Sequence, residues 1–291
     1  MIEYSIAGCP IKVSGRGLNH ISGFMPFVPA IYSGGEAVLQ LQLGVPLLDW
    51  NVAPLHTFFF SDGEDVVCSF AVNNGNYLLR MEKLGAAPSL VTVMKHEDRF
   101  VAKTNMDHES NGDLLRFGCW IAFGIACIHH QTVALHASTV CYEGKSILFL
   151  GESGTGKSTH TRLWLNHIAG AELLNDDSPF VRIMDDNSVM AFGSPWSGKT
   201  PCYINKSAPV AAIVRLSQAP HNKITRLKGI AALGALLPSC PPAFAYDERM
   251  LGRITDILDV ILQWVPVFSL ECLPNPEAAY LMHETLYEIT I

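Results

Sequence analysis

The chain has 291 residues, of which 49% are hydrophobic and 16% are charged, and its formal net charge is −7 at pH 7. This composition is typical of a globular protein with enough apolar side chains to build one or two domains. The acidic balance disfavours charge-driven binding to nucleic acid or to an anionic membrane, and the eight cysteines include no C-x-x-C pair that would indicate a zinc site.

The N-terminal region, residues 1–108, is rich in short runs typical of β-strands. EAVLQLQLG, HTFFFS, DVVCSFAV, NYLLRME and SLVTVMK are apolar or alternating, and Asn74-Gly75 is a strong signal for a hairpin turn. The opening MIEYSIAGCPIKV has no basic segment before a long apolar run, so we expect no secretory signal and a cytoplasmic location. We predict a β-rich region over residues 1–108, to which the sequence assigns no role, and a second domain over residues 109–291.

The second region begins with a predicted helix that ends near residue 129 and is too short and too interrupted by Arg116 to span a membrane. TVALHASTVCY and SILFL, joined by the turn at Glu143-Gly144-Lys145, predict a hairpin, and Asp185-Asp186-Asn187 predicts another. Helices over about 247–265 and 276–287 flank the strand VFSLEC. Because hairpins surround the centre of this region, we predict an α+β fold with a mixed, partly antiparallel β-core and flanking helices, and not an alternating parallel sheet.

The segment GESGTGKST has the spacing G-x-x-x-x-G-K-S, which is typical of a loop that wraps nucleotide phosphates. Its glycines permit turns that direct backbone N–H groups inward, and a helix predicted over 159–168 adds a positive dipole. The lysine can reach the β- and γ-phosphates, and the serine hydroxyl can bind Mg²⁺. We expect the nucleotide to be ATP, although no motif reads the base. The predicted nucleotide-binding residues are Gly151, Glu152, Ser153, Gly154, Thr155, Gly156, Lys157, Ser158 and Thr159.

Three further features are candidates for the same site. Asp176-Asp177 closes the predicted strand AELLN, where one carboxylate can hold Mg²⁺ while the other accepts a proton from a hydroxyl. His136, in LHAS, lies on the strand that enters the hairpin before the loop, although a lone histidine on a strand is more often structural. Lys199, in SPWSGKTP, is either an exposed loop lysine or a cation that neutralises the transferred phosphoryl group.

LHASTVCYEGKSILFLGESGTGKST followed by LLNDDSPF resembles the core of the HPr kinase/phosphorylase and phosphoenolpyruvate carboxykinase superfamily, over about residues 130–205. The resemblance implies a mixed β-core with flanking helices and places His136 at the reacting phosphate. It also implies that Ser158 and Asp177 hold Mg²⁺, with Mn²⁺ as an alternative, and that Asp176 is the base toward the acceptor. The wording of LHAS and GESGTGKS is like the carboxykinases, whereas the spacing and chain length are like the C-terminal domain of HPr kinases.

These features predict a Mg²⁺-dependent phosphotransferase that moves the γ-phosphate of ATP to a hydroxyl of a protein, a peptide or a small molecule. Two alternatives are a carboxykinase-like enzyme acting on oxaloacetate and an ATP-binding regulatory module with little turnover. The chain lacks the arginine- and glycine-rich loop that follows the core of HPr kinases, so HPr is not expected as the acceptor, whose identity the sequence leaves open. Because HPr kinases are oligomers, a homo-oligomer is expected by analogy.

Overall fold

The chain forms two compact units. The computed structural model describes residues 1–15, 18–31, 35–60, 66–97, 99–107, 109–110, 112–198 and 201–290. Unit 1 comprises Met1–His130 with Ala243–Leu251, and unit 2 comprises Gln131–Pro242 with Gly252–Ile291. Helix α1 (Gly112–Ile128) belongs to unit 1, so the compact units divide after residue 130, whereas the sequence-based domain boundary lies at residue 108.

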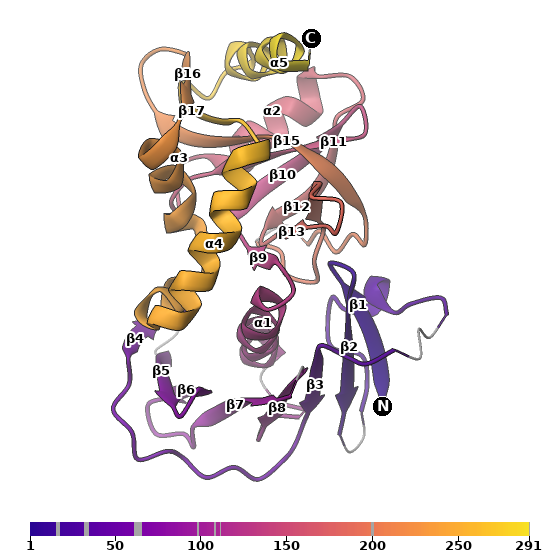
Figure 1. The fold of residues 1–291 in the computed structure, drawn as a ribbon, viewed down its shortest axis with the longest axis vertical. Helices are drawn as coiled ribbons and strands as arrows, with labels where there is room; N and C mark the ends of the chain where they lie inside the picture. Colours follow the sequence, from indigo (N-terminus) through magenta and orange to yellow (C-terminus); the bar gives the residue numbers. More distant parts are fainter. Residues whose placement is uncertain are drawn as a thin grey trace. The chain divides into compact units, whose positions relative to one another are not determined.

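Unit 1 is built on a β-sheet against which α1 packs, with contacts to β3, β6, β7 and β8 (Figure 1). Within the described residues the sheet has eight strands in the order β1-β2-β3-β8-β7-β6-β5-β4. The strands are β1 (Ile2–Ile6), β2 (Cys9–Ser14), β3 (Leu39–Gln42), β4 (His56–Phe59), β5 (Val66–Asn73), β6 (Asn76–Lys83), β7 (Ser89–His96) and β8 (Arg99–Thr104). The short 3₁₀ helices η1 (Met25–Phe27) and η3 (Pro242–Tyr246) lie outside the sheet.

The hairpin predicted at Asn74-Gly75 is confirmed. Asn73 pairs with Asn76, and the two turn residues have φ angles of 51° and 76°. A two-residue turn with both central φ angles positive matches the right-handed twist of the flanking strands, which is why Asn-Gly favours it. The expected β-rich character of the N-terminal region is confirmed with it.

Unit 2 is built on a mixed sheet, which confirms the predicted α+β fold (Figure 1). In the part of the chain that the structure describes, one path of strands runs β12-β10-β11-β15-β14-β13-β9, and β17 pairs with both β15 and β16. The strands are β9 (Thr132–Ala134), β10 (Ala137–Tyr142), β11 (Lys145–Leu150), β12 (Glu172–Asp177), β13 (Phe180–Ile183), β14 (Val189–Phe192), β15 (Ser207–Gln218), β16 (Lys223–Leu227) and β17 (Val267–Cys272). The pairs β10–β11 and β13–β14 are the two predicted antiparallel hairpins, whereas β11–β15 and β15–β17 are parallel.

Helices flank this sheet as expected. They are α2 (Lys157–His167), α3 (Gly229–Leu236), α4 (Glu248–Trp264) and α5 (Pro276–Thr290), with the 3₁₀ helix η2 (Leu237–Ser239). The core cluster between α2, α5 and the central strands includes Phe149, Trp164, Val214, Leu270 and Met282. Sequence analysis predicted neither β16 nor α3. For α3 the reason is that GIAALGAL carries two glycines, which are poor helix formers.

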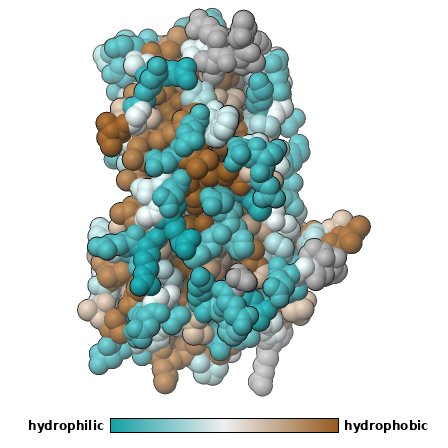
Figure 2. All heavy atoms as spheres, in the orientation of Figure 1, coloured by the Kyte–Doolittle hydropathy of each residue, from teal (hydrophilic) through white to brown (hydrophobic). Residues whose placement is uncertain are grey.

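The surface carries scattered apolar side chains, as is normal for a folded protein. Leu48, Phe59, Leu84 and Ile230 are among the exposed large hydrophobic residues. Figure 2 shows hydrophobic residues lying between hydrophilic ones on the face that it draws. No helix among the described residues has the length and apolar character that a membrane span requires.

Gly193, which follows β14, lies where a side chain has no room. A Cβ atom there would stand 2.0 Å from the carbonyl oxygen of Ile204 and 3.1 Å from that of Leu174. Overpacking against fixed groups costs about 1–3 kcal/mol, so we expect Gly193→Ala to lower the free energy of unfolding by about this amount. Urea denaturation measures the change. The matched control is Gly234→Ala in α3, where a Cβ meets nothing within 4 Å; equal stability of the two variants would contradict the steric argument.

Candidate active site

The phosphate loop lies between β11 and α2, as its spacing predicts. β11 ends at Leu150 and α2 begins at Lys157, so residues 151–156 form the connection. Gly151 and Gly156 have φ angles of 155° and 106°, conformations that residues with a Cβ rarely adopt. The first N–H groups of a helix have no partner within the helix, so the start of α2 suits an anion. This geometry would allow the predicted loop residues to bind phosphates.

The side chain of Lys157 donates hydrogen bonds to its own loop and to His136. Its Nζ donates to the carbonyl oxygens of Gly151 at 2.8 Å and Glu152 at 3.2 Å, and to Nε2 of His136 at 2.9 Å. Burial lowers the pKa of Lys157 below that of an ordinary lysine, and the carboxylates of Asp177 and Asp176 oppose this shift. The ammonium group is therefore held at the loop beside two carboxylates.

His136 connects this lysine to the aspartate pair. Ala137 pairs with Leu150 on one side and with Asp177 on the other, so the preceding histidine lies between the loop and the end of β12. Its Nδ1 is 3.2 Å from Oδ1 of Asp177. Because Nε2 accepts from the lysine, the proton of the neutral ring belongs on Nδ1, where it donates to the carboxylate. The main-chain N–H of His136 donates to the carbonyl of Ser239 at 2.6 Å, which fixes the backbone.

The two aspartates have different partners. Oδ1 of Asp176 accepts a hydrogen bond of 3.0 Å from Oγ of Ser158, whereas Asp177 contacts His136. The two side chains thus make different contacts, although both carboxylates act on the pKa of Lys157. A serine hydroxyl beside a carboxylate is a suitable set of oxygen ligands for Mg²⁺ at bound phosphates. The resemblance to known kinases assigned the metal to the other aspartate.

A buried asparagine holds the chain from Ser194 to Gly198 beside the pair. Nδ2 of Asn175 donates to Oγ of Ser194 at 3.3 Å and to the carbonyl of Trp196 at 3.1 Å. The N–H of Gly198 donates to the carbonyl of Asp176 at 2.6 Å. The next residue, Lys199, is a predicted site residue and lies outside the described residues.

Arg215, near the end of β15, is a further cation beside the loop, for which the sequence favoured the role of a surface charge. It pairs with Leu150, the last residue before the loop. One guanidinium nitrogen donates to the carbonyl of Ala235 at 3.2 Å, and the other lies 3.5 Å from a carboxylate oxygen of Glu152. The only sequence signal was an arginine close to the end of a predicted strand, which is also common for surface charges.

One pocket of unit 2 adjoins the loop and has a volume of about 560 Å³. We call it the β15–β17 pocket, because it opens where these two strands end. Its lining residues are Gly154, Thr155, Gly156, Thr159, His160, Leu163, Leu216, Gln218, Ala219, Pro220, Cys272, Leu273 and Pro274.

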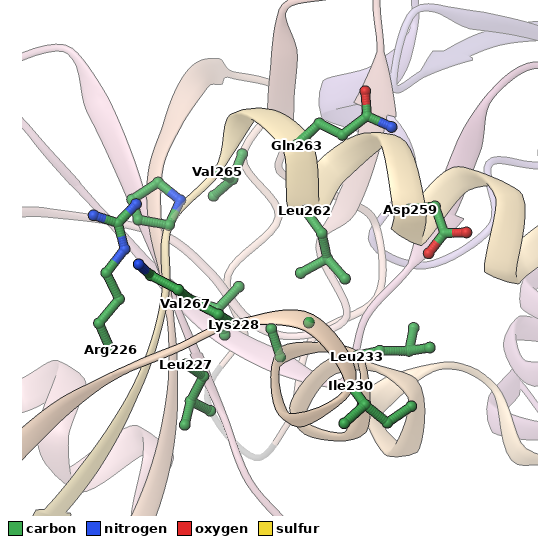
Figure 3. A pocket seen from close by; sticks show the side chains of 13 residues that line it. Arg226, Leu227, Lys228, Ile230, Leu233, Asp259, Leu262, Gln263, Val265 and Val267 are labelled. Atoms are coloured by element: carbon green, nitrogen blue, oxygen red, sulfur yellow. The ribbon is translucent and has the colours of Figure 1, made fainter.

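Another pocket, of about 480 Å³, lies between α3 and α4. Figure 3 shows Arg226 and Lys228 on one side of it and Asp259 and Gln263 on α4. None of the residues that line this second pocket belongs to the phosphate loop.

Comparison with known proteins gives a distant structural likeness. The solved structure of the Hpr(Ser) kinase/phosphatase from Coxiella burnetii is similar with a TM-score of 0.32 and 14% sequence identity, over 54% of this chain and 89% of that chain. No protein-family model matches the chain, and no curated protein sequence matches it. At this TM-score and identity the likeness carries no argument about activity.

Proposed function

We propose that the chain is a Mg²⁺-dependent phosphotransferase that moves the γ-phosphate of ATP to a hydroxyl group. The observation that carries this proposal is the connected series Asp177–His136–Lys157 at the mouth of a phosphate loop, with Ser158 and Asp176 beside it. A loop that only bound nucleotide would need the lysine and the serine. A carboxylate oriented by a histidine beside the phosphates adds a group that can accept a proton.

The donor side is supplied by the loop. Its N–H groups, the start of α2 and Lys157 would hold the β- and γ-phosphates. Ser158 and Asp176 would hold Mg²⁺, which when bound neutralises charge that develops on the phosphate oxygens. Arg215 would add a further positive charge once its contact with Glu152, whose side chain is 83% exposed, is exchanged for phosphate.

The acceptor side is supplied by the pair that includes Asp177. A hydroxyl oxygen of the acceptor attacks the γ-phosphorus, the bond between that phosphorus and the β–γ bridging oxygen breaks, and ADP leaves. The hydroxyl proton passes to the carboxylate of Asp177, whose position His136 maintains. This division gives the metal to Asp176 and the proton to Asp177, the reverse of the roles that the family resemblance implies.

Transfer from γ-labelled ATP tests the proposal. The purified chain would be incubated with Mg²⁺, labelled ATP and, in separate reactions, a cell extract, serine-containing peptides and free serine. We expect label to enter an acid-stable phosphomonoester in at least one reaction, and not when Lys157→Ala replaces the wild-type chain. Tight ATP binding without transfer to any acceptor would contradict the proposal and leave the regulatory module as the function.

A second assay, with oxaloacetate as the substrate, tests the carboxykinase-like alternative. ATP- and Mn²⁺-dependent conversion of oxaloacetate to phosphoenolpyruvate, in the absence of transfer to hydroxyl acceptors, would replace the proposed function. We expect no conversion, because the arginine that the proposal places at the loop, Arg215, is assigned to the phosphates of ATP and not to a substrate carboxylate.

A further inference from the structure

The order of the strands gives the nucleotide site two different sides. The loop follows β11, whose neighbours are β10 on one side and β15 on the other, with β17 beyond β15. The residues proposed for chemistry, His136 and the aspartate pair, lie on the β10 and β12 side. The β15–β17 pocket lies on the opposite side, where the parallel strands β11, β15 and β17 all end. Ligands of open α/β sheets bind outside such carboxyl ends.

The walls of this pocket suit a flat, largely apolar group attached to a phosphate. Leu163, Leu216, Pro220 and Leu273 supply apolar surface, while Gly154, Gly156 and Thr159 connect the pocket directly to the loop. Its volume of about 560 Å³ is in the range of small-molecule sites. Gln218 closes one edge by donating from Nε2 to the carbonyl of Gly154 at 3.2 Å. A ligand with phosphates in the loop can therefore extend into the pocket without leaving the surface of the sheet.

A buried histidine in the wall supplies an independent sign of a polar ligand. His160 is only 3% exposed, its ring meets the edge of Phe149 at a centroid distance of 4.6 Å, and neither ring nitrogen has a hydrogen-bond partner among the described residues. A buried polar group without a partner costs stability, so native proteins rarely keep one without a reason. Both nitrogens are enclosed in this structure, so a ligand in the pocket would supply the missing partner once the ring turns toward it.

We propose that the β15–β17 pocket receives the base and ribose of a purine nucleotide, with His160 as a hydrogen-bonding residue in its wall. This inference rests on the proposed function, because it assumes that the phosphates occupy the loop. The assignment of the base to this pocket also fixes the orientation of the bound nucleotide. The γ-phosphate points toward Asp177 and His136, and the base points toward the ends of β15 and β17. Ala219 and Leu273, which come from connections after these strands, then decide how well the base fits.

Filling the pocket separates the base from the phosphates. We expect Ala219→Trp to weaken binding of Mg·ATP by about tenfold or more, since a lost base contact of the stacking type has this size, while binding of Mg·tripolyphosphate changes less than about twofold. Isothermal titration calorimetry measures both ligands. The matched control is Ala169→Trp, at an exposed position after α2, which is expected to bind both ligands as the wild type does. Equal losses for both ligands, or no loss for either, would overturn the proposal.

His160→Leu provides a second test that does not depend on filling the pocket. Leucine removes two buried nitrogens that lack partners, so the unfolding temperature should equal or exceed that of the wild type. If the histidine serves the nucleotide, ATP affinity falls several-fold while tripolyphosphate affinity is unchanged. A more stable variant with unaltered ATP affinity would show that His160 is structural only and would overturn its role.

The wild-type chain distinguishes this inference from the proposed function. Tighter binding of ATP than of tripolyphosphate, without transfer to any acceptor, supports the pocket assignment and contradicts the phosphotransferase. Equal affinity of the two ligands for the wild type overturns the pocket assignment, whatever the outcome of the transfer assay.

Discussion

Asp177→Asn is expected to reduce phosphoryl transfer by about 10²–10⁴-fold, the usual size of a general-base contribution. Asparagine has nearly the same shape, and its amide oxygen can still accept the Nδ1–H of His136. The histidine and Lys157 therefore keep their places, and ATP affinity is expected to change by less than about threefold. The variant loses only the ability to take a proton from the acceptor. Initial rates with labelled ATP, and calorimetry for binding, separate the two effects.

The neighbouring carboxylate is the internal control for this prediction. Asp176 contacts the hydroxyl of Ser158, so Asp176→Asn is expected to raise the Mg²⁺ concentration required for half-maximal rate, and excess Mg²⁺ should restore part of the rate. Asp177→Asn should show no such restoration. The opposite pattern, with Mg²⁺ restoring Asp177→Asn alone, would support the roles that the family resemblance implies instead.

Lys157→Ala is expected to reduce transfer by about 10²–10³-fold, which is typical for removal of one group that stabilises the transition state. The change also removes the donor to the carbonyls of Gly151 and Glu152 and to His136. We therefore expect weaker ATP binding together with the lower rate. The measurements are the initial rate at saturating ATP and the dissociation constant of Mg·ATP.

Lys145→Ala is the matched control, because this lysine is exposed and lies at the opposite end of β11. The Lys145→Ala variant should transfer phosphate at the wild-type rate. That result would show that the lower rate of Lys157→Ala does not come merely from the loss of one positive charge. A Lys157→Ala variant as active as the wild type would remove the loop lysine from the mechanism.

Part of the site could be predicted because it is local in the sequence. The loop spacing, the strand before it and the Asp176-Asp177 pair are short motifs, and each lies where it was expected. His136 was placed by the hairpin, since the turn at Glu143-Gly144 sets the register that brings Ala137 opposite Leu150. The mixed sheet was predicted from this hairpin together with the one at Asp185-Asp186-Asn187.

The remaining features depend on segments that are far apart in the chain. Arg215 reaches the loop only because β15 pairs with β11 in parallel, and no local motif announces that pairing. The carbonyls of Ala235 and Ser239, which hold Arg215 and His136, belong to the unpredicted segment around α3. The proposed division of roles within the aspartate pair depends on the register of β12 against β10, which sets the partner of each carboxylate. A one-residue shift in register would exchange the two, so the sequence alone left it open.

The position of β15 also determines when the site can form as the chain folds. This strand pairs with β11 at Leu150–Arg215, with β14 at Phe192–Ser207 and with β17 at Arg215–Ser269, so its neighbours come from three separate stretches of the sequence. Such pairings form slowly, because closing a long loop costs entropy before the contacts that reward it are made. The phosphate loop therefore acquires its full surroundings only at a late stage of folding. We therefore expect the proposed nucleotide binding to report the completed assembly of unit 2, because β17 comes from the last part of the chain.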